Sequence, residues 1–277
     1  MRSLDGKVVV ITGAASGIGR ALAVEAAARG ALLALSDVDE AGLARTAQAC
    51  AGTREVRADR VDVADRAAMF AYAADVAAHF GRVNVLVNNA GVALHGDLED
   101  LEYADLDWIV GVNFWGVLHG TKEFLPHLIA SGDGHLVTLS SLYGLLSMPG
   151  QSAYNATKYA VRGMTEAVRE ELLIAGHPVG VTVVHPGGIK TAIARSARTS
   201  AKVDHDAAAR LFDEKLATMP PEKAARIIWR GVLRGKPRVL VGMDAHLIHQ
   251  FARLTGARYQ DVVARVHRGL GDRIERS

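Results

Sequence analysis

The sequence predicts an α/β protein whose parallel sheet of about seven strands is doubly wound, with helices on both faces. Short apolar runs alternate along the chain with longer stretches of helical periodicity, an order typical of strand–helix–strand units. The apolar runs are mostly continuous, which indicates strands that are buried on both faces. A glycine-rich turn joins the first run to the first helical stretch.

The periodicity gives bounds to each element. The predicted strands are Lys7–Thr12, Ala31–Ser36, Glu55–Val61, Val83–Asn88, His135–Ser140, Gly180–His185 and Arg238–Val241. The predicted helices are Gly17–Arg29, Asp39–Cys50, Asp65–Phe80, Tyr103–Ala130 and Ser152–Ala175. Two or three further helices are expected after the second proline of Met219-Pro220-Pro221.

Composition excludes several classes of protein. Hydrophobic residues make up 49% of the 277 residues, enough for a buried core, and the net charge of +2 provides no field for holding nucleic acid. The single cysteine, Cys50, excludes an internal disulfide. No stretch has the length and apolarity of a membrane span or the pattern of a signal peptide, so a cytoplasmic setting is expected.

The C-terminal part of the chain is basic. Residues 221–277 contain 12 Lys/Arg and 5 Asp/Glu, a local charge of +7 that leaves −5 for the first 220 residues. One interpretation is terminal helices with solvated basic faces. The other is an amphipathic surface that contacts a membrane or an acidic partner through Leu247, Ile248, Phe251 and Leu254. His246 and His249 lack the ligands that would complete a metal site, so no metal is predicted.

The glycine-rich turn reads Thr12-Gly13-Ala14-Ala15-Ser16-Gly17-Ile18-Gly19. Gly13 permits a tight turn, Gly17 lets the backbone approach a pyrophosphate, and Gly19 lets the helix pack close to the strand. The N-terminus of the following helix supplies N–H groups and a positive dipole end to phosphates. In this strand–turn–helix context the motif predicts a nucleotide site.

Asp37 closes the second predicted strand. At that position a carboxylate can accept hydrogen bonds from both ribose hydroxyls of an adenosine, and it would repel a 2′-phosphate. No Arg or Lys follows until Arg45, so NAD(H) is favoured over NADP(H). The alternative is that Asp37 caps the helix that begins near Asp39.

Tyr154 and Lys158 are four residues apart and therefore share a helix face. A free tyrosine has a pKa of ~10, too high for a base at neutral pH. An ammonium ~4 Å away contributes ~4 kcal/mol at an effective dielectric of ~20, which would lower that pKa by up to ~3 pH units. The pair is a candidate proton donor and acceptor for a carbonyl or alcohol oxygen; alone, the spacing also fits an ordinary surface helix turn.

Several motifs occur together in one order: Thr12–Gly19, Asp62-Val63, Asn88-Asn89-Ala90-Gly91, Asn113, Ser141, Tyr154/Lys158 and Pro186-Gly187. With them, over about residues 4–245, the chain resembles the compact, single-domain short-chain dehydrogenase/reductases, in which the serine also precedes the tyrosine by 13 residues. The resemblance implies one Rossmann-fold domain over residues 1–245, with a substrate lid near 190–220. A C-terminal helical extension would span 246–277.

The resemblance also implies roles for individual residues. Tyr154 would be the catalytic acid/base, and Lys158 would lower its pKa and bind the nicotinamide ribose. Ser141 would bind the substrate oxygen, and Asn113 would hold a water that links Lys158 to solvent. The cofactor would contact Gly13, Ser16, Gly17, Ile18, Gly19, Asp37, Asp62, Val63, Asn89, Ala90, Gly91, Tyr154, Lys158, Pro186, Gly187, Ile189 and Thr191.

The implied function is hydride transfer between NAD(H) and a secondary alcohol or ketone by a homo-oligomer, either a dimer or a tetramer. The substrate cleft is expected to be lined by Leu94, His95, Tyr143, Leu145, Met148, Gly188 and Ile193. Most of these side chains are apolar, which favours a neutral, apolar substrate. Alternatives are an NADPH-linked 3-ketoacyl reductase, a nucleotide-sensing binding protein, and a lyase or epimerase that uses bound NAD.

Overall fold

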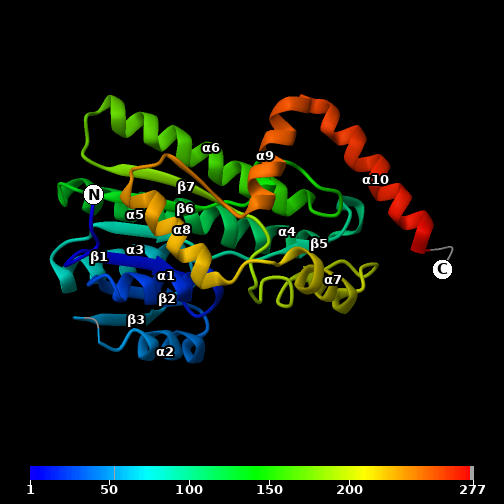
Figure 1. The fold of residues 1–277 in the computed structure, drawn as a ribbon. Coiled ribbons are helices and arrows are strands. Elements are labelled where there is room, and N and C mark those ends of the chain that lie inside the picture. The colour runs from blue at the N-terminus through cyan, green and yellow to red at the C-terminus, as the bar shows by residue number, and fades with distance from the viewer. Residues whose placement is uncertain (53, 275–277) are drawn as a thin grey trace.

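Seven parallel strands form the central sheet of the computed structural model, which describes residues 1–52 and 54–274 (Figure 1). Their order across the sheet is β3-β2-β1-β4-β6-β7-β9. The strands are β1 (Val8–Thr12), β2 (Leu32–Asp37), β3 (Val56–Arg60), β4 (Val85–Asn88), β6 (His135–Leu139), β7 (Gly180–Pro186) and β9 (Arg238–Val241). The predicted doubly wound parallel sheet is confirmed, and each predicted strand is present with bounds that differ by at most two residues.

The order of the strands creates a crevice at the middle of the sheet. From β1 the chain moves outward to β2 and β3, then returns to place β4 on the other side of β1. In the pairing register, Val10 of β1 lies between Ala34 of β2 and Leu86 of β4. Ligands of open parallel sheets bind at such a switch point, outside the carboxyl ends of the strands. The glycine-rich turn and Asn89 both emerge there, from β1 and β4.

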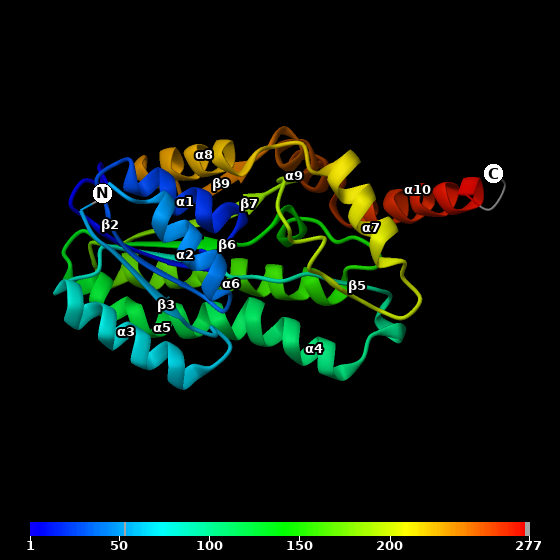
Figure 2. The ribbon, with the colours of Figure 1, turned by 90° about the horizontal axis from the view of Figure 1, so that it is seen from below.

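Helices cover both faces of the sheet, as Figure 2 shows. On one face α1, α2 and α8 pack around a core that includes Trp229 and Ile228; on the other, α3, α5 and α6 pack around Phe124 and Met69. The helices are α1 (Gly17–Ala27), α2 (Glu40–Ala49), α3 (Arg66–Phe80), α4 (Tyr103–Val110), α5 (Gly116–Ala130), α6 (Ser152–Ile174), α7 (His205–Leu211), α8 (Pro221–Leu233), α9 (Met243–Thr255) and α10 (Tyr259–Ile274).

The predicted helical stretch Tyr103–Ala130 is present with its predicted bounds, and it contains one π-helical turn. A π-helical turn, Gly111–Trp115, separates α4 from α5. The backbone there makes i→i+5 hydrogen bonds, a form that occurs mostly as single turns at functional sites. The 3.6-residue periodicity does not distinguish this wider turn from a regular helix, so the helical stretch was predicted and the π-helical turn within it was not.

The segment expected to form a lid contributes one strand to a second, small sheet. Two short parallel strands, β5 (Leu94–His95) and β8 (Arg198–Thr199), join the loop after β4 to the segment after β7. Helix α7 follows. Strands of two residues have too little periodicity to be predicted from the sequence.

Beyond β9 the chain continues into α9 and α10, and α10 extends away from the body of the molecule (Figure 1). Of the side chains expected on the apolar surface, Leu247 and Leu254 are exposed and Ile248 and Phe251 are half-buried. Residues 275–277 of the expected extension lie outside the described residues. In the part of the chain that the structure describes, no helix is long and apolar enough to cross a membrane.

Candidate active site

The glycine-rich turn lies between β1 and α1 with a backbone that few other residues could adopt. Gly13 and Gly17 have positive φ angles of 65° and 52°. A Cβ on Gly19 would lie 2.1 Å from the carbonyl oxygen of Gly13, so α1 approaches the turn at a distance that only glycine permits. Ser16 precedes α1 in an extended conformation, and its side chain makes no capping hydrogen bond. The first N–H groups of α1 therefore have no side-chain cap.

Asn89 and Thr12 fasten this turn to the end of β4. The Nδ2 of Asn89 donates to the carbonyl oxygens of Thr12 (2.9 Å) and Gly13 (3.0 Å). The Oγ1 of Thr12 accepts hydrogen bonds from the backbone N–H groups of Asn89 and Ala90, both at 3.1 Å. Four hydrogen bonds thus fix the turn relative to the central strands before any ligand binds.

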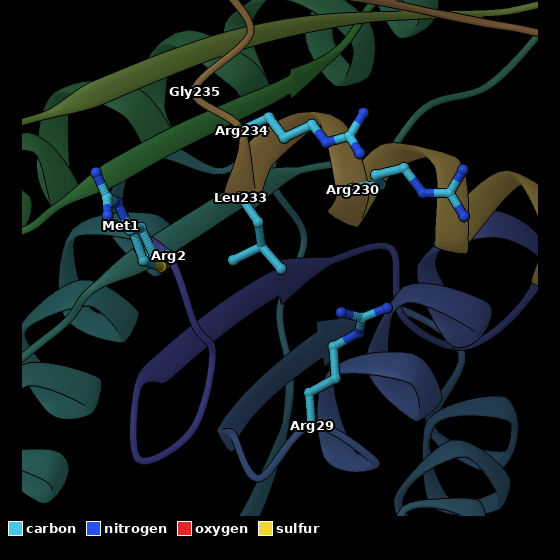
Figure 3. Close-up of a pocket in the computed structure, with 7 residues that line it drawn as sticks. All are labelled: Met1, Arg2, Arg29, Arg230, Leu233, Arg234 and Gly235. Carbon is cyan, nitrogen blue, oxygen red and sulfur yellow. The ribbon is translucent and has the colours of Figure 1, made fainter.

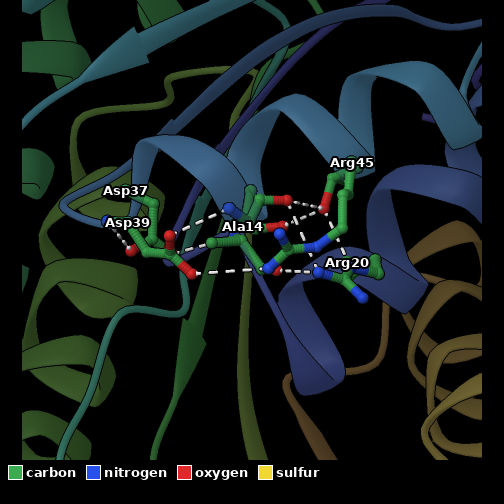
Figure 4. Close-up of polar contacts among 8 residues, drawn as sticks. Ala14, Arg20, Asp37, Asp39 and Arg45 are labelled. Atoms are coloured by element: carbon green, nitrogen blue, oxygen red, sulfur yellow. Dashed lines mark hydrogen bonds and ion pairs between the residues drawn. The ribbon is translucent and has the colours of Figure 1, made fainter.

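Asp37 lies at the carboxyl end of β2, beside the same turn (Figure 4). Its Oδ2 accepts a hydrogen bond from the N–H of Ala15 (2.8 Å), and its Oδ1 accepts one from the N–H of Asp39 (3.0 Å). The cap of α2 is Asp39, whose carboxylate accepts from the N–H of Gly42. The alternative role of Asp37 as the cap is therefore wrong.

Two arginines lie near Asp37, and sequence reasoning noted only one of them. Arg45 forms an ion pair with Asp39 at 3.9 Å. Arg20, on α1, donates from Nε to the Oγ1 of Thr46 (3.0 Å) and from Nη2 to the carbonyl oxygens of Ala15 and Gly42. Figure 4 shows Arg20 directed at these backbone oxygens. Both guanidinium groups thus have partners within the protein.

Asp62 and Val63 follow β3 at the same edge of the sheet. Asp62 is exposed, and its Oδ1 accepts a hydrogen bond from the N–H of Ala64 at 2.9 Å. Val63 is buried, and a Cβ on Gly116 would lie 2.6 Å from its Cγ2, so α5 packs closely against it. Asp62 and Val63 therefore border the crevice on its β3 side, farther from β1 than Asp37 is.

The remaining predicted cofactor residues lie on the loop after β7. Thr191 lies against the glycine-rich turn, because a Cβ on Gly17 would be 3.1 Å from its Cγ2. The N–H of Gly188 donates to the Oδ2 of Asp244 at 2.6 Å, and Ile189 forms an isolated bridge with Met219. Asp244, on α9, was not noted from the sequence. It anchors the loop from the C-terminal part of the chain.

Ser141, Tyr154 and Lys158 come together where β6 ends and α6 begins. Lys158 is 4% exposed; its Nζ lies 5.5 Å from the centroid of the Tyr154 ring and donates to the carbonyl oxygen of Leu139 (3.2 Å). The side chain of Ser141 lies close enough to Tyr154 to act on its pKa. The i, i+4 spacing therefore brings Tyr154 and Lys158 together on one face of α6, and α6 itself packs against the segment containing Ser141.

The electrostatics of this pair differ from the expectation. Burial raises the pKa of Tyr154 to about 12, although the side chain of Ser141 acts in the opposite direction. Burial also lowers the pKa of Lys158 to about 8. For the protein alone, the expected lowering of the tyrosine pKa by Lys158 is therefore wrong: both groups are desolvated, and desolvation favours the neutral form of each.

Asn113 lies in the π-helical turn and is fully buried. Its Oδ1 accepts a hydrogen bond from the N–H of Val92 (2.8 Å), and its Nδ2 donates to the carbonyl oxygen of Val92 (2.9 Å). A longer contact of 3.3 Å joins Nδ2 to the Oγ1 of Thr157 on α6. The side chain of Asn113 thus holds the loop after Gly91 against α6. Its contact on α6 is Thr157, the residue before Lys158.

The predicted substrate-cleft residues differ in their surroundings. Leu94 is 1% exposed and packs in a cluster with Ile109 and Ala153, so it is a core residue and contributes no surface to a cleft. Tyr143 directs its ring edge at Tyr154, with centroids 6.2 Å apart at 89°. His95 contacts the Nε2 of Gln151, and burial lowers its pKa. Leu145 and Gly188 are buried, and Met148 and Ile193 are half-buried.

Asn155 is a further residue that sequence reasoning missed. It is 5% exposed, and its Nδ2 donates to the carbonyl oxygens of Tyr143 (2.8 Å) and Leu146 (3.2 Å). Its Oδ1 accepts from the N–H of Met148 at 3.1 Å. One side chain thus fastens the segment between Ser141 and Tyr154. The signal was an amide residue directly after the tyrosine.

A cavity of about 620 Å³ lies at the opposite, amino-terminal edge of the sheet (Figure 3). It is lined by Met1, Arg2, Arg29, Arg230, Leu233, Arg234 and Gly235. Three of the arginines stand at the C-terminal ends of α1 and α8, where cations complement the helix dipoles, and Arg29 also pairs with Glu25 at 2.6 Å. These three arginines therefore have a structural explanation, and the cavity is not part of the candidate active site.

The comparisons with known proteins agree with this geometry. The family model described as short chain dehydrogenase matches residues 7–202, which is more than half of the chain. The chain belongs to the short-chain dehydrogenase family. It is an oxidoreductase of that family, whose enzymes use NAD(P)(H).

Three relatives of this short-chain dehydrogenase illustrate the likeness. A protein of Mycobacterium tuberculosis that carries the name oxidoreductase SadH is 55% identical over 265 residues, covering 95% of this chain and 96% of that protein. A short-chain dehydrogenase/reductase from Burkholderia phymatum in complex with NAD has a TM-score of 0.82 at 34% identity, covering 96% and 97% of the chains. An alcohol dehydrogenase from Thermococcus sibiricus complexed with 5-hydroxy-NADP has a TM-score of 0.72 at 28% identity, covering 86% and 95%.

Proposed function

We propose that this chain transfers a hydride between NAD(H) and a neutral, apolar secondary alcohol or ketone. The observation that carries the proposal is the meeting of Ser141, Tyr154 and Lys158 at the carboxyl edge of the sheet, beside the glycine-rich turn. A hydroxyl donor, a phenol and an amine in contact provide the groups that a carbonyl or alcohol oxygen needs.

The residues at the switch point fit a dinucleotide. The first N–H groups of α1 carry no side-chain cap at Ser16, and Gly17, the first residue of α1, has no Cβ to obstruct a pyrophosphate. The residues that would hold the cofactor are Gly13, Ser16, Gly17, Ile18, Gly19, Asp37, Asp62, Val63, Asn89, Ala90, Gly91, Tyr154, Lys158, Pro186, Gly187, Ile189 and Thr191. When bound there, the nicotinamide ring supplies the hydride chemistry.

The side chains of this chain would handle the proton. In oxidation Tyr154 takes the alcohol proton, and in reduction it returns a proton to the carbonyl oxygen. Ser141 donates a hydrogen bond to the same oxygen and fixes its position. Because burial holds the pKa of Tyr154 at about 12, the phenolate needs a nearby positive charge, which protonated Lys158 supplies. Asn113 would hold the water through which Lys158 exchanges protons with solvent.

Asp37 supports a preference for NAD(H) over NADP(H). Each of its carboxylate oxygens accepts one backbone hydrogen bond and keeps capacity for a ribose hydroxyl. A 2′-phosphate would lie against this negative charge. The guanidinium group of Arg20 is engaged by the carbonyl oxygens of Ala15 and Gly42 and by Thr46, so it is not free to receive that phosphate. Arg45 forms an ion pair with Asp39 at 3.9 Å.

Replacing Asp37 by Ala is expected to weaken NAD binding about tenfold and to relax the preference for NAD over NADP. The variant loses both ribose hydrogen bonds and the repulsion of a 2′-phosphate. Titration calorimetry with each dinucleotide measures the ratio of affinities. Asp107→Ala is the matched control, because it removes an exposed carboxylate on α4 that is not among the cofactor residues; an unchanged NAD:NADP ratio in Asp37→Ala refutes the assignment.

The function itself is tested by NADH formation from NAD across a panel of secondary alcohols that differ in size. The apolar Leu145, Met148 and Ile193 support neutral, apolar substrates. Turnover that increases with apolar bulk supports the proposed class of substrate. If no alcohol of the panel gives NADH although NAD still binds, the result contradicts the dehydrogenase assignment and favours a nucleotide-sensing protein. Turnover with NADPH and 3-ketoacyl thioesters instead favours the ketoacyl reductase alternative.

A further inference from the structure

A groove of about 690 Å³ separates α10 from the start of α6. Its lining residues are Ser147, Met148, Pro149, Ser152, Asn155, Ala156, Tyr159, Tyr259, Gln260, Val263 and Ala264. The α6 residues among these recur at the spacing of one helix face. Tyr154 and Lys158 lie on the opposite face, because successive residues of a helix are rotated by about 100°. The C-terminal helix therefore stands behind the candidate active site.

Tyr259, the first residue of α10, crosses this groove. It is 9% exposed, and its hydroxyl oxygen accepts a hydrogen bond from the backbone N–H of Ser147 at 3.1 Å. Tyr159 on α6 lines the same groove and interacts electrostatically with Tyr259. Burial alone would raise the pKa of Tyr259, but the hydrogen bonds with Ser147 and its neighbours outweigh burial and lower it. A residue 112 positions further along the chain thus holds the loop that leads into the site.

The loop held by Tyr259 is connected directly to the reacting groups. Asn155 binds the same loop from inside through the N–H of Met148 and the carbonyl oxygens of Tyr143 and Leu146. Tyr143 packs its ring edge against Tyr154, and its N–H donates to the Oγ of Ser141 at 3.1 Å. Hydrogen bonds therefore hold the loop from two elements: Asn155 on α6 and Tyr259 on α10.

We propose that Tyr259 is a positioning residue that holds residues 145–149 in place, so that the C-terminal helix helps to set the apolar wall of the substrate site. The inference rests on the proposed function, because it assigns Leu145 and Met148 of this loop to the substrate side. The hydrogen bond from Ser147 to Tyr259 is separate from the reacting groups. Tyr259 lies behind α6 and touches neither Tyr154 nor Lys158 in any contact of the described residues.

The direct test is hydrogen exchange of the Ser147 amide in full-length protein, followed through overlapping peptides by mass spectrometry. Tyr259→Phe removes the acceptor and keeps the ring. We expect the Ser147 amide to exchange about tenfold faster in this variant, a typical effect of losing one such hydrogen bond. Exchange of peptides from the central strands should stay unchanged. Tyr103→Phe is the matched control, because Tyr103 is 84% exposed on α4.

Steady-state kinetics give the second readout. In Tyr259→Phe we expect the KM for the bulkiest apolar alcohol of the panel to rise about three- to tenfold. The kcat for the smallest alcohol should remain within about twofold of the wild-type value, because the reacting groups stay in place. A uniform fall in kcat for all substrates, together with faster exchange throughout the molecule, would indicate a merely structural role and overturn the proposal.

The exchange and kinetic measurements distinguish a failure of this inference from a failure of the proposed function. If the wild-type protein oxidises none of the alcohols, the proposed function fails, and the exchange arm still decides whether Tyr259 holds the loop. Unchanged Ser147 exchange in Tyr259→Phe overturns the inference whatever the kinetics show. Tyr159→Phe provides a graded check: it leaves the Ser147–Tyr259 hydrogen bond intact and should raise Ser147 exchange less than Tyr259→Phe does.

Discussion

Tyr154→Phe is expected to lower kcat about 10³-fold, within the range typical of general acid–base groups, and to leave NAD affinity within about twofold. The substitution removes one oxygen and keeps the ring that packs edge-on against Tyr143. Without the hydroxyl, the proposed proton donor and acceptor beside Ser141 is lost. Single-turnover measurements of NADH formation, alongside calorimetric titration with NAD, separate the loss of chemistry from any loss of binding.

The matched control for this variant is Tyr103→Phe, which makes the same change at an exposed position. It should leave kcat unchanged. Turnover of Tyr154→Phe within tenfold of the wild-type value would contradict the assignment of Tyr154 as the acid/base. Another group would then have to supply the proton.

Lys158→Met is expected to abolish most turnover and yet raise the free energy of unfolding at pH 7. Burial lowers the pKa of Lys158 to about 8. The cost of burying its charge is fully present below pH 8, and it diminishes as the pH rises toward the unfolded value of ~10.5. A pKa difference of ~2.5 corresponds to ~3 kcal/mol, and losing the hydrogen bond to Leu139 offsets ~1 kcal/mol. The variant should therefore gain ~2 kcal/mol at pH 7.

Urea unfolding at pH 7 and at pH 9.5 measures this dependence. The difference in the free energy of unfolding between Lys158→Met and the wild type should shrink toward zero by about pH 9.5, as the native lysine loses its proton. Tyr154 does not interfere in this window, since burial raises its pKa and its effect on stability begins only above pH ~10. Lys223→Met, at an exposed position on α8, should show no such dependence. A variant less stable than wild type at pH 7 would show that Lys158 is stabilised as an ammonium.

The sheet was predictable because buried parallel strands leave continuous apolar runs, and the order of the runs follows from the strand–helix–strand pattern. The strand Arg238–Val241 has the predicted bounds for this reason. The position of α10 was not predictable: Tyr259 contacts Ser147 across 112 residues of chain, and no local pattern encodes that distance. The two-residue strands β5 and β8 escaped prediction because their pairing depends on tertiary structure.

The sequence predicted which residues form the candidate site more successfully than it predicted their burial and pKa values. The spacing of Tyr154 and Lys158 correctly placed them on one helix face, but the expected change in the tyrosine pKa included only the charge of the lysine. Burial of both groups reverses the result, and burial is a property of the fold. Arg20 illustrates the same limit. Its sequence position beside Gly19 gives no sign that its guanidinium is directed to the carbonyl oxygens of Ala15 and Gly42.

The π-helical turn at Gly111–Trp115 has a consequence for how the sequence of this protein can change in length. Such a turn contains one residue more than the α-helical turn it replaces. Deleting a single residue within it would restore a regular helix and leave α4 and α5 in nearly the same relative rotation, because the wider turn had absorbed the extra residue. Asn113 would then leave its two hydrogen bonds with Val92. A single-residue deletion here should therefore preserve the packing of α4 and α5, and its main cost should be the loss of the hydrogen bonds by which Asn113 holds Val92.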